Sequence, residues 1–141
     1  MKNWKWFDLA KEPILQGVDP EVISLLDVAR QKTVEIDPAG KGCPFVITSG
    51  RRTVEANAAL KDSASRSAHI PRPPSEYSTA VDIACVDWQG AAFIVMGLIL
   101  AGFRRIGIYY KPDGSTKIPT HIHGDRATDL PTPALWVTEE K

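Results

Sequence analysis

The apolar run Ala91–Gly102, AAFIVMGLILAG, is the feature that most constrains the fold. Its length is well under the roughly 20 residues that a membrane-spanning helix needs. We therefore expect a buried core helix over residues 89–102, ended by Gly102. The chain has 141 residues, which is the size of one ordinary domain. We expect residues 1–141 to form a single domain around one core.

The charge balance argues against several classes of partner. Lysine plus arginine number 17 and aspartate plus glutamate also number 17, so the formal net charge is zero. A balanced chain predicts no binding to nucleic acid or anionic lipid. The first residues, MKNWKWFDLAKEP, are polar and aromatic and contain no apolar stretch of the signal-peptide type. We expect a monomer that is synthesised in a cytoplasm and does not insert into a membrane.

Two cysteines, Cys43 and Cys85, are too few for a disulfide scaffold. Both stand within apolar runs, which favours their interpretation as small buried hydrophobic residues. Sequence alone leaves open whether they form a bridge, because that depends on the distance between them.

The remaining patterns predict an α+β domain. Asp19 and Pro20 are typical of a helix start, as N-cap and first helical residue. We expect residues 1–18 to form a leader segment that packs on the rest of the domain. We expect the C-terminal stretch that contains Trp136 to form a tail that packs through its apolar side chains. Between them we expect helices over 20–35 and 53–60, strands over 44–49, 79–86, 105–110 and 119–125, a long polar loop over 61–78, and a turn over 111–117 that makes the last two strands an antiparallel hairpin.

The strand predicted at Thr79–Val86 carries an unusual carboxylate. Its alternation places Asp82 on one face, between Ala80 and Ala84. The opposite face is apolar, with Val81, Ile83 and Cys85. A carboxylate flanked by two alanines indicates an open face of small residues where something is bound.

The chain has three histidines, His69, His121 and His123. On a strand, the last two lie on one face about 7 Å apart. Together with His69 in a polar loop next to Asp82, they suit zinc, which takes imidazole nitrogens and carboxylate oxygens. The spacing alone also allows structural histidines and a paired core carboxylate.

Several segments together resemble one family. SAH and STAVDIA, at 67–69 and 78–84, resemble the Ser-x-His and Ala-x-Asp signature of the zinc D-Ala-D-Ala carboxypeptidases and L-alanyl-D-glutamate endopeptidases. THIHGD is similar to their closing His-x-His segment, and TSGRRT with Asn57 is similar to their upstream Ser-Gly-x-Arg-Thr segment. AGFRRIGIYY and LPTPALWV also resemble phage and bacterial members. The resemblance covers about residues 20–137 and implies the fold shared with hedgehog domains: a small antiparallel sheet that carries the zinc site and packs against helices.

The resemblance assigns roles to individual residues. It implies that His69, Asp82 and His123 bind Zn²⁺. Arg52 would lie near the substrate carboxylate or the developing oxyanion, where its planar fork binds two oxygens at once. His121 would lie beside the zinc water, able to donate to it or to the tetrahedral intermediate. The alternatives are a surface salt bridge for Arg52 and a packing role for His121.

Two further residues match the same motifs. Asp125 shares the strand face of the paired histidines, and the resemblance suggests that it orients a ligand from behind. The alternative is a turn residue at the strand end. Ser67 matches the family serine, but it could equally be a loop hydroxyl.

The chain departs from the family between His69 and Asp82. The 12 intervening residues, IPRPPSEYSTAV, make this segment longer than in the family, and Ser78 stands at a family glycine position. The segment is rich in proline and therefore stiff. We interpret it as a wall or lid that shapes the substrate groove.

A second departure concerns the general base. Thr120 and Lys117 occupy the positions at which relatives carry a Glu or Asp base. We take His121 and Asp113 as the catalytic candidates, and Glu76 in the long loop as a further possible carboxylate. Asp113 precedes Gly114, so the alternative for it is an ordinary turn residue.

The resemblance implies zinc-dependent hydrolysis of a peptide bond in the peptidoglycan stem peptide. A catalytic domain of this kind without a signal peptide is similar to a phage or prophage endolysin, which reaches the cell wall after holin-type release or cell lysis. The resemblance does not separate a carboxypeptidase from an endopeptidase. The alternative is a non-catalytic, zinc-containing binding module of the same fold, as hedgehog domains illustrate.

Overall fold

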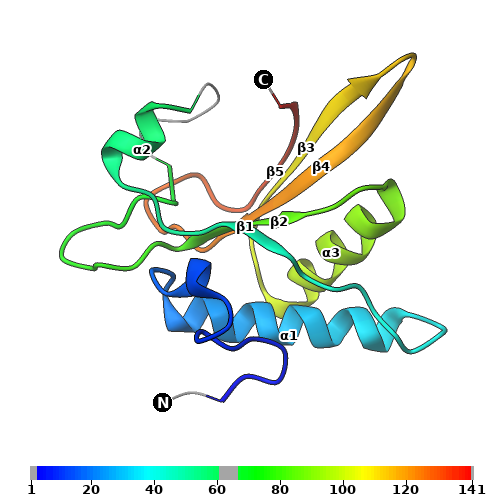
Figure 1. Cartoon of the computed structure of the whole chain (residues 1–141), viewed down its shortest axis with the longest axis horizontal. Coiled ribbons are helices and arrows are strands. Elements are labelled where there is room, and N and C mark those ends of the chain that lie inside the picture. The colour runs from blue at the N-terminus through cyan, green and yellow to red at the C-terminus, as the bar shows by residue number, and fades with distance from the viewer. Residues whose placement is uncertain (1–2, 61–66, 141) are drawn as a thin grey trace.

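The computed structural model describes residues 3–60 and 67–140 and shows an α+β protein (Figure 1). The described residues form three α-helices, one short 3₁₀ helix and one mixed sheet of five strands. The elements are η1 (Pro13–Leu15), α1 (Pro20–Ile36), β1 (Ile47–Ser49), α2 (Val54–Ala58), β2 (Ala80–Ala84), α3 (Trp88–Ala101), β3 (Arg105–Asp113), β4 (Thr116–Asp125) and β5 (Ala134–Glu139).

The strand order is β1-β2-β4-β3-β5, and β5 runs parallel to β3. The prediction of an antiparallel sheet is therefore wrong at this edge, and the predicted tail is a strand. The reason lies in the connection after β4. Asp125, the last residue of β4, pairs with Arg105, the first residue of β3, and the chain then passes around that end of β3. It starts β5 beside Arg105, with the Ala134 amide donating to the Arg104 carbonyl at 2.8 Å.

The β3–β4 hairpin is longer than predicted. The two strands pair as far as Asp113 and Thr116, so most of the predicted turn over 111–117 is strand. The predicted Asp-Gly tip is confirmed, and Gly114 adopts a φ of 61° there. The tip projects away from the rest of the molecule (Figure 1).

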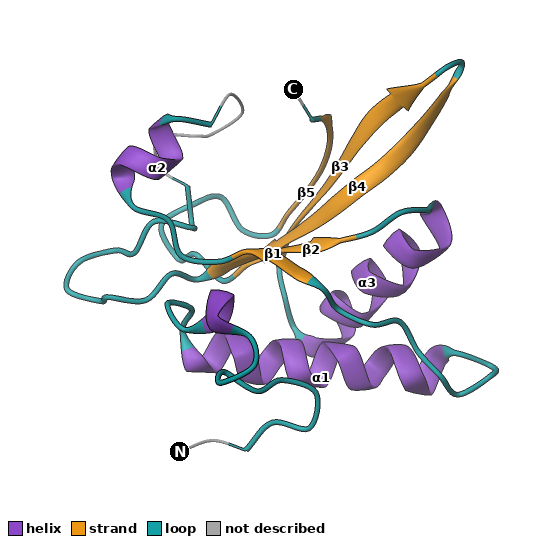
Figure 2. Cartoon of the chain, in the orientation of Figure 1, coloured by secondary structure: helices purple, strands orange, loops and turns teal. Residues whose placement is uncertain are grey.

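The predicted N-cap Asp19 and the predicted helix end at Gly102 are confirmed, and Asp87 is a further cap that the sequence analysis did not name. Asp19 caps α1 by accepting from the Glu21 amide, and Asp87 caps α3 by accepting from the Gly90 amide. Gly102 ends α3 in the left-handed conformation, with a φ of 105°. Helices α1 and α3 pack together on one side of the sheet, and α2 lies on the other side (Figure 2).

Helix α3 is only partly buried, which corrects the prediction of a buried core helix. Ile94 and Leu98 are buried against the core, whereas Met96, Ile99 and Leu100 are exposed. A helix that is apolar all round does not reveal which of its sides is covered. Among the elements of the described residues, α1, β3 and β4 pack against α3. Within the described residues, no helix is both long and apolar enough to cross a membrane.

Aromatic side chains before residue 18 pack on α1. Phe7 is buried in the core, and Trp6 stacks on the guanidinium of Arg30 at 4.1 Å. The Trp6 amide donates to the Asp27 carboxylate at 2.7 Å. These contacts hold the leader segment against the helix.

Cys43 and Cys85 are free thiols, both partly buried against the core. Burial raises the pKa of the Cys43 thiol, and it raises the pKa of Cys85 to about 11. Both cysteines therefore act as small hydrophobic groups near neutral pH.

Candidate metal centre

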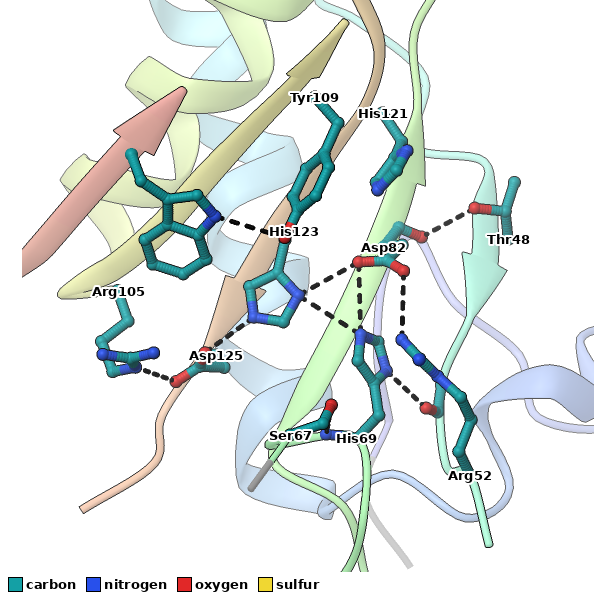
Figure 3. A network of polar contacts seen from close by, with 12 residues as sticks. Thr48, Arg52, Ser67, His69, Asp82, Arg105, Tyr109, His121, His123 and Asp125 are labelled. Atoms are coloured by element: carbon teal, nitrogen blue, oxygen red, sulfur yellow. Dashed lines mark hydrogen bonds and ion pairs between the residues drawn. The ribbon is translucent and has the colours of Figure 1, made fainter. Parts of the chain in front are cut away.

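Three polar side chains converge on the face of the sheet opposite α1 and α3 (Figure 3). His69 Nε2 lies 3.3 Å from Asp82 Oδ1 and 3.3 Å from His123 Nδ1. His123 Nδ1 lies 3.1 Å from Asp82 Oδ1. All three residues are buried, and together they could hold a metal ion.

The sheet register brings two of these residues together. Asp82 on β2 pairs directly with His123 on β4, and paired residues point to the same face. This face also carries His121 and Asp125, as the alternation predicts.

His69 belongs to no strand, and backbone contacts on two sides fix its position. The Arg52 amide donates to the His69 carbonyl at 2.8 Å, and the Thr79 amide donates to the Ala68 carbonyl at 3.2 Å. The ring itself is oriented by Gly50, whose carbonyl accepts from His69 Nδ1 at 2.7 Å. The residue that follows β1 therefore fixes the orientation of the His69 ring beside Asp82.

These hydrogen bonds determine which nitrogen of each ring is free. Because the Gly50 carbonyl can only accept, His69 Nδ1 carries the proton, and the lone pair of Nε2 points into the cluster. His123 Nε2 donates to Asp125 Oδ2 at 2.7 Å, which leaves the lone pair of Nδ1 inside. Three acceptor atoms, two nitrogens and the oxygen of Asp82, thus face one point.

The spacing of these atoms fits a tetrahedral ion. Their separations of 3.1–3.3 Å are close to the value of about 3.4 Å between ligands that each lie about 2.1 Å from a tetrahedral zinc ion. Three acceptors at this distance repel one another unless a proton or a cation lies between them. This donor set with its outward hydrogen bonds could hold a metal ion, and three protein ligands would leave one tetrahedral position open.

Charge in the cluster favours a cation. Burial raises the pKa of Asp82, but the adjacent rings of His123 and His69, which favour the ionised carboxylate when either ring is protonated, outweigh it, and the net pKa lies well below the usual range. Burial likewise lowers the pKa of His123, whereas its bonds to Asp125 and Asp82 raise it, and the net pKa is raised. A buried carboxylate therefore stays ionised and attracts positive charge to this point.

Asp125 supports the cluster from behind, as the resemblance suggests. It accepts from His123 with Oδ2 and from Arg105 Nε with Oδ1, the latter at 2.8 Å, and the Ala127 amide also donates to Oδ1 at 3.0 Å. Burial raises the pKa of Asp125, but the His123 bond and Arg105 outweigh it and leave the pKa lowered. The ionised carboxylate holds the imidazole in one orientation and one tautomer.

Arg52 lies beside the carboxylate of Asp82. Its Nη2 atom is 3.7 Å from Asp82 Oδ2, and its Nη1 atom donates to Asn57 Oδ1 at 3.0 Å. The Nε atom is buried and has no acceptor among the described residues. The guanidinium is thus anchored to Asn57 and turns Nη2 toward Asp82.

His121 lies next along β4 and stacks on Tyr109, with the ring centroids 4.3 Å apart. Its Nδ1 atom is 3.3 Å from Thr120 Oγ1 and 3.8 Å from Glu140 Oε1. Burial lowers the pKa of His121, although Asp82 and Glu140 raise it, so the ring is neutral near pH 7. The sequence interpretation missed Glu140, because its position depends on β5 lying beside β3.

Trp136 forms an aromatic wall beside the cluster. Its ring is 5.4 Å from that of His123, and its Nε1 donates to the Tyr109 hydroxyl at 3.2 Å. The indole covers Gly107, where a Cβ atom would overlap its ring atoms. Gly107 therefore allows Trp136 to lie flat on the sheet.

The other candidate residues lie elsewhere or act locally. Asp113 is exposed at the hairpin tip, so the structure does not bring it to the cluster. Glu76 is also exposed. Ser67 accepts from the His69 amide at 3.2 Å and thus shapes the turn before His69. Ser78 is buried. Its amide donates to the Gly17 carbonyl, and its carbonyl accepts from the Asp19 amide.

Arg72 also anchors the long segment between His69 and Asp82, besides the backbone bonds of Ser78. Arg72 donates to the carbonyls of Ser67 and Ile70 at 2.6 and 2.9 Å, and its Nε donates to Asp129 at 2.8 Å. This arginine thus joins the segment to the connection that precedes β5.

Comparisons of this chain with protein-family models, with curated proteins and with solved structures find no match.

Proposed function

We propose that this protein is a zinc-dependent peptidase of the hedgehog-type metallopeptidase fold that hydrolyses a peptide bond in the peptidoglycan stem. The proposal of a zinc site rests on one observation: three lone pairs, from His69, Asp82 and His123, converge at tetrahedral spacing. The resemblance of the surrounding motifs to those of zinc peptidases supports peptide hydrolysis and the peptidoglycan substrate. The resemblance of AGFRRIGIYY and LPTPALWV to phage and bacterial members supports an endolysin role.

Zinc suits this donor set better than other common metals. Two imidazoles and one carboxylate are the ligands of many catalytic zinc sites, whereas magnesium and calcium prefer oxygen ligands alone. Zinc bound by three protein groups lowers the pKa of a water molecule at its open position and polarises a carbonyl oxygen.

Arg52 is the residue that binds the substrate oxygen. Its side chain is held by Asn57, and its buried Nε still lacks an acceptor among the described residues. Its Nη2 atom, which lies 3.7 Å from Asp82 Oδ2, would donate to a substrate carboxylate or to the oxyanion that develops during hydrolysis.

His121 is the proton acceptor in this proposal. It is neutral near pH 7, lies on the same strand face as His123, and has Glu140 behind its Nδ1 atom. Glu140 stabilises the imidazolium that forms when the other nitrogen takes a proton. This pair supplies the carboxylate that Lys117 and Thr120 do not provide.

The test is incubation of the zinc-loaded protein with purified peptidoglycan, followed by measurement of new free amines and by mass spectrometry of the stem peptides. We expect products from the natural protein and none from Asp82→Asn. The matched control is Asp113→Asn, which removes an exposed carboxylate at the hairpin tip and should leave product formation intact.

Two outcomes would contradict the proposal. Full zinc loading without any product would instead support the non-catalytic zinc-binding module. Failure of the natural protein to bind zinc, measured by metal analysis after dialysis, would remove the metal centre itself.

A further inference from the structure

A second polar cavity lies on the same sheet face, beyond Asp125. Its volume is about 400 Å³, and it is formed where β4 leaves the sheet and the connection to β5 passes around β3. The residues that line it are Arg104, Arg105, Asp125, Arg126, Ala127, Thr128, Leu130 and Thr132.

This cavity has an excess of positive charge. Its one carboxylate, Asp125, is fully engaged, since Oδ1 accepts from Arg105 and Ala127 and Oδ2 accepts from His123. Within the described part of the chain, neither Arg104 nor Arg126 has an ion-pair partner. Two exposed guanidinium groups therefore line the cavity with their charge uncompensated.

Arg105 adds donors at the base of the cavity. A guanidinium has five N–H donors, and Arg105 uses one on Asp125 and one on the Pro131 carbonyl. The remaining donors stay available, while Ala127 and Leu130 provide apolar wall. A planar anion on a short apolar stem matches this combination of guanidinium groups and apolar surface.

The cavity lies next to the candidate metal centre. Asp125 and His123 are two residues apart on β4 and share one face, which places them about 7 Å apart. An extended peptide covers that distance in about two residues. One peptide could therefore occupy both sites at once.

We propose that this arginine-lined cavity binds a carboxylate-bearing group, with Arg104 and Arg126 as the residues that recognise it. This inference rests on the proposed peptidase function where it concerns substrate: the cavity is then the subsite for an acidic side chain about two residues from the hydrolysed bond. Binding of a carboxylate at the cavity itself does not depend on hydrolysis.

The first experiment measures binding of glutarate to the zinc-loaded protein by calorimetry, with uncharged glutaramide for comparison. We expect glutarate to bind, glutaramide not to bind, and each of Arg104→Gln and Arg126→Gln to weaken glutarate binding about tenfold. Lys41→Gln, which removes one positive charge in the turn after α1, is the matched control and should bind glutarate as the natural protein does.

Two results would overturn the cavity assignment. One is glutarate binding that is unaffected by both arginine substitutions. The other is binding that is lost in Asp82→Asn and retained in both arginine variants, which would place the carboxylate on the metal instead.

The second experiment addresses substrate and separates the two proposals. If stem peptides are hydrolysed, Arg126→Gln should raise KM about tenfold for a peptide with a free acidic side chain, and much less for the same peptide amidated at that position. Equal effects on both peptides would refute the subsite. If no peptide is hydrolysed, the peptidase proposal fails, and the glutarate measurement alone decides the cavity.

Discussion

The two faces of the central sheet are built from alternate residues of the same strands, yet they are held together by different forces. Toward α1 and α3 the strands present Val81, Ile83 and Ile122, all fully buried. On the opposite face stand Asp82 and His123, fixed by hydrogen bonds of defined direction. The first face requires only volume and apolar character, whereas the second requires particular atoms at particular distances.

The difference also has an energetic side. Each large apolar side chain on the helix-covered face contributes about 1.5–3 kcal/mol through burial. On the other face, burial of His69, Asp82 and Asp125 costs free energy that only hydrogen bonds, opposite charge or a cation can offset. The polar face is therefore the part of the domain whose stability should depend on metal.

The largest expected effect is the loss of this metal dependence in His123→Ala. At free zinc about 1,000-fold above the dissociation constant, zinc should stabilise the natural protein by about 4 kcal/mol, and the variant should show almost none of this gain. Chemical denaturation with and without chelator measures both values. An undiminished zinc effect in the variant would show that the ion binds elsewhere.

The apolar face gives the contrasting result. Ile122→Ala leaves a cavity under β4 and should lower the free energy of unfolding by about 3 kcal/mol, with or without zinc. The same denaturation experiment measures it. The difference between zinc-loaded and chelated protein should persist, and its disappearance would mean that the two faces are strongly coupled.

Asp125→Asn tests the support behind the cluster. The amide cannot carry the charge that holds His123 and Arg105, so zinc affinity should fall by about 10–100-fold. Competition with a fluorescent zinc chelator measures this affinity. An affinity within twofold of the natural protein would argue that Asp125 serves only Arg105.

The pH dependence should have opposite signs with and without metal. In the metal-free protein, the raised pKa of His123 contributes stability that is present below about pH 6.5 and is lost as pH rises through the folded pKa. The lowered pKa values of Asp82 and Asp125 contribute stability that is present above about pH 3.9 and is lost as pH falls through their folded values.

Zinc reverses the histidine contribution, because it binds only the neutral ring. Zinc affinity should therefore rise with pH, by at most about tenfold per pH unit for each histidine that must lose a proton. Thermal melts between pH 5.5 and 7.5 should show a growing gap between zinc-loaded and chelated samples. A constant gap would contradict the assignment of histidine ligands.

The smallest expected effect is that of Gly107→Ala. The added methyl group meets the Trp136 indole, so the ring must shift at a cost of about 1 kcal/mol. Because Trp136 lies beside His123 on the polar face, tryptophan fluorescence should change while α1 and α3 remain packed. An unchanged spectrum would show that the indole has room to move.

Local patterns predicted much of this domain. Alternation in TAVDIACV placed Asp82 opposite the core, and the His-x-His spacing placed His121 and His123 on one face, as the register of β2 and β4 confirms. Asp19 caps α1 as predicted, by accepting a short-range hydrogen bond. These features depend on neighbours in the chain, and backbone geometry fixes them within a few residues.

Long-range pairing decided what the local pattern could not. Glu140 reaches His121 only because β5 runs parallel beside β3, and the ring of His69 is oriented by a carbonyl at Gly50. The arginine-lined cavity likewise exists only because the chain passes around the end of β3. Residue identity and strand period come from the sequence by itself, since they follow from covalent geometry. Which distant atoms meet is decided by the packing of the whole chain, because each such contact depends on where the other strands lie.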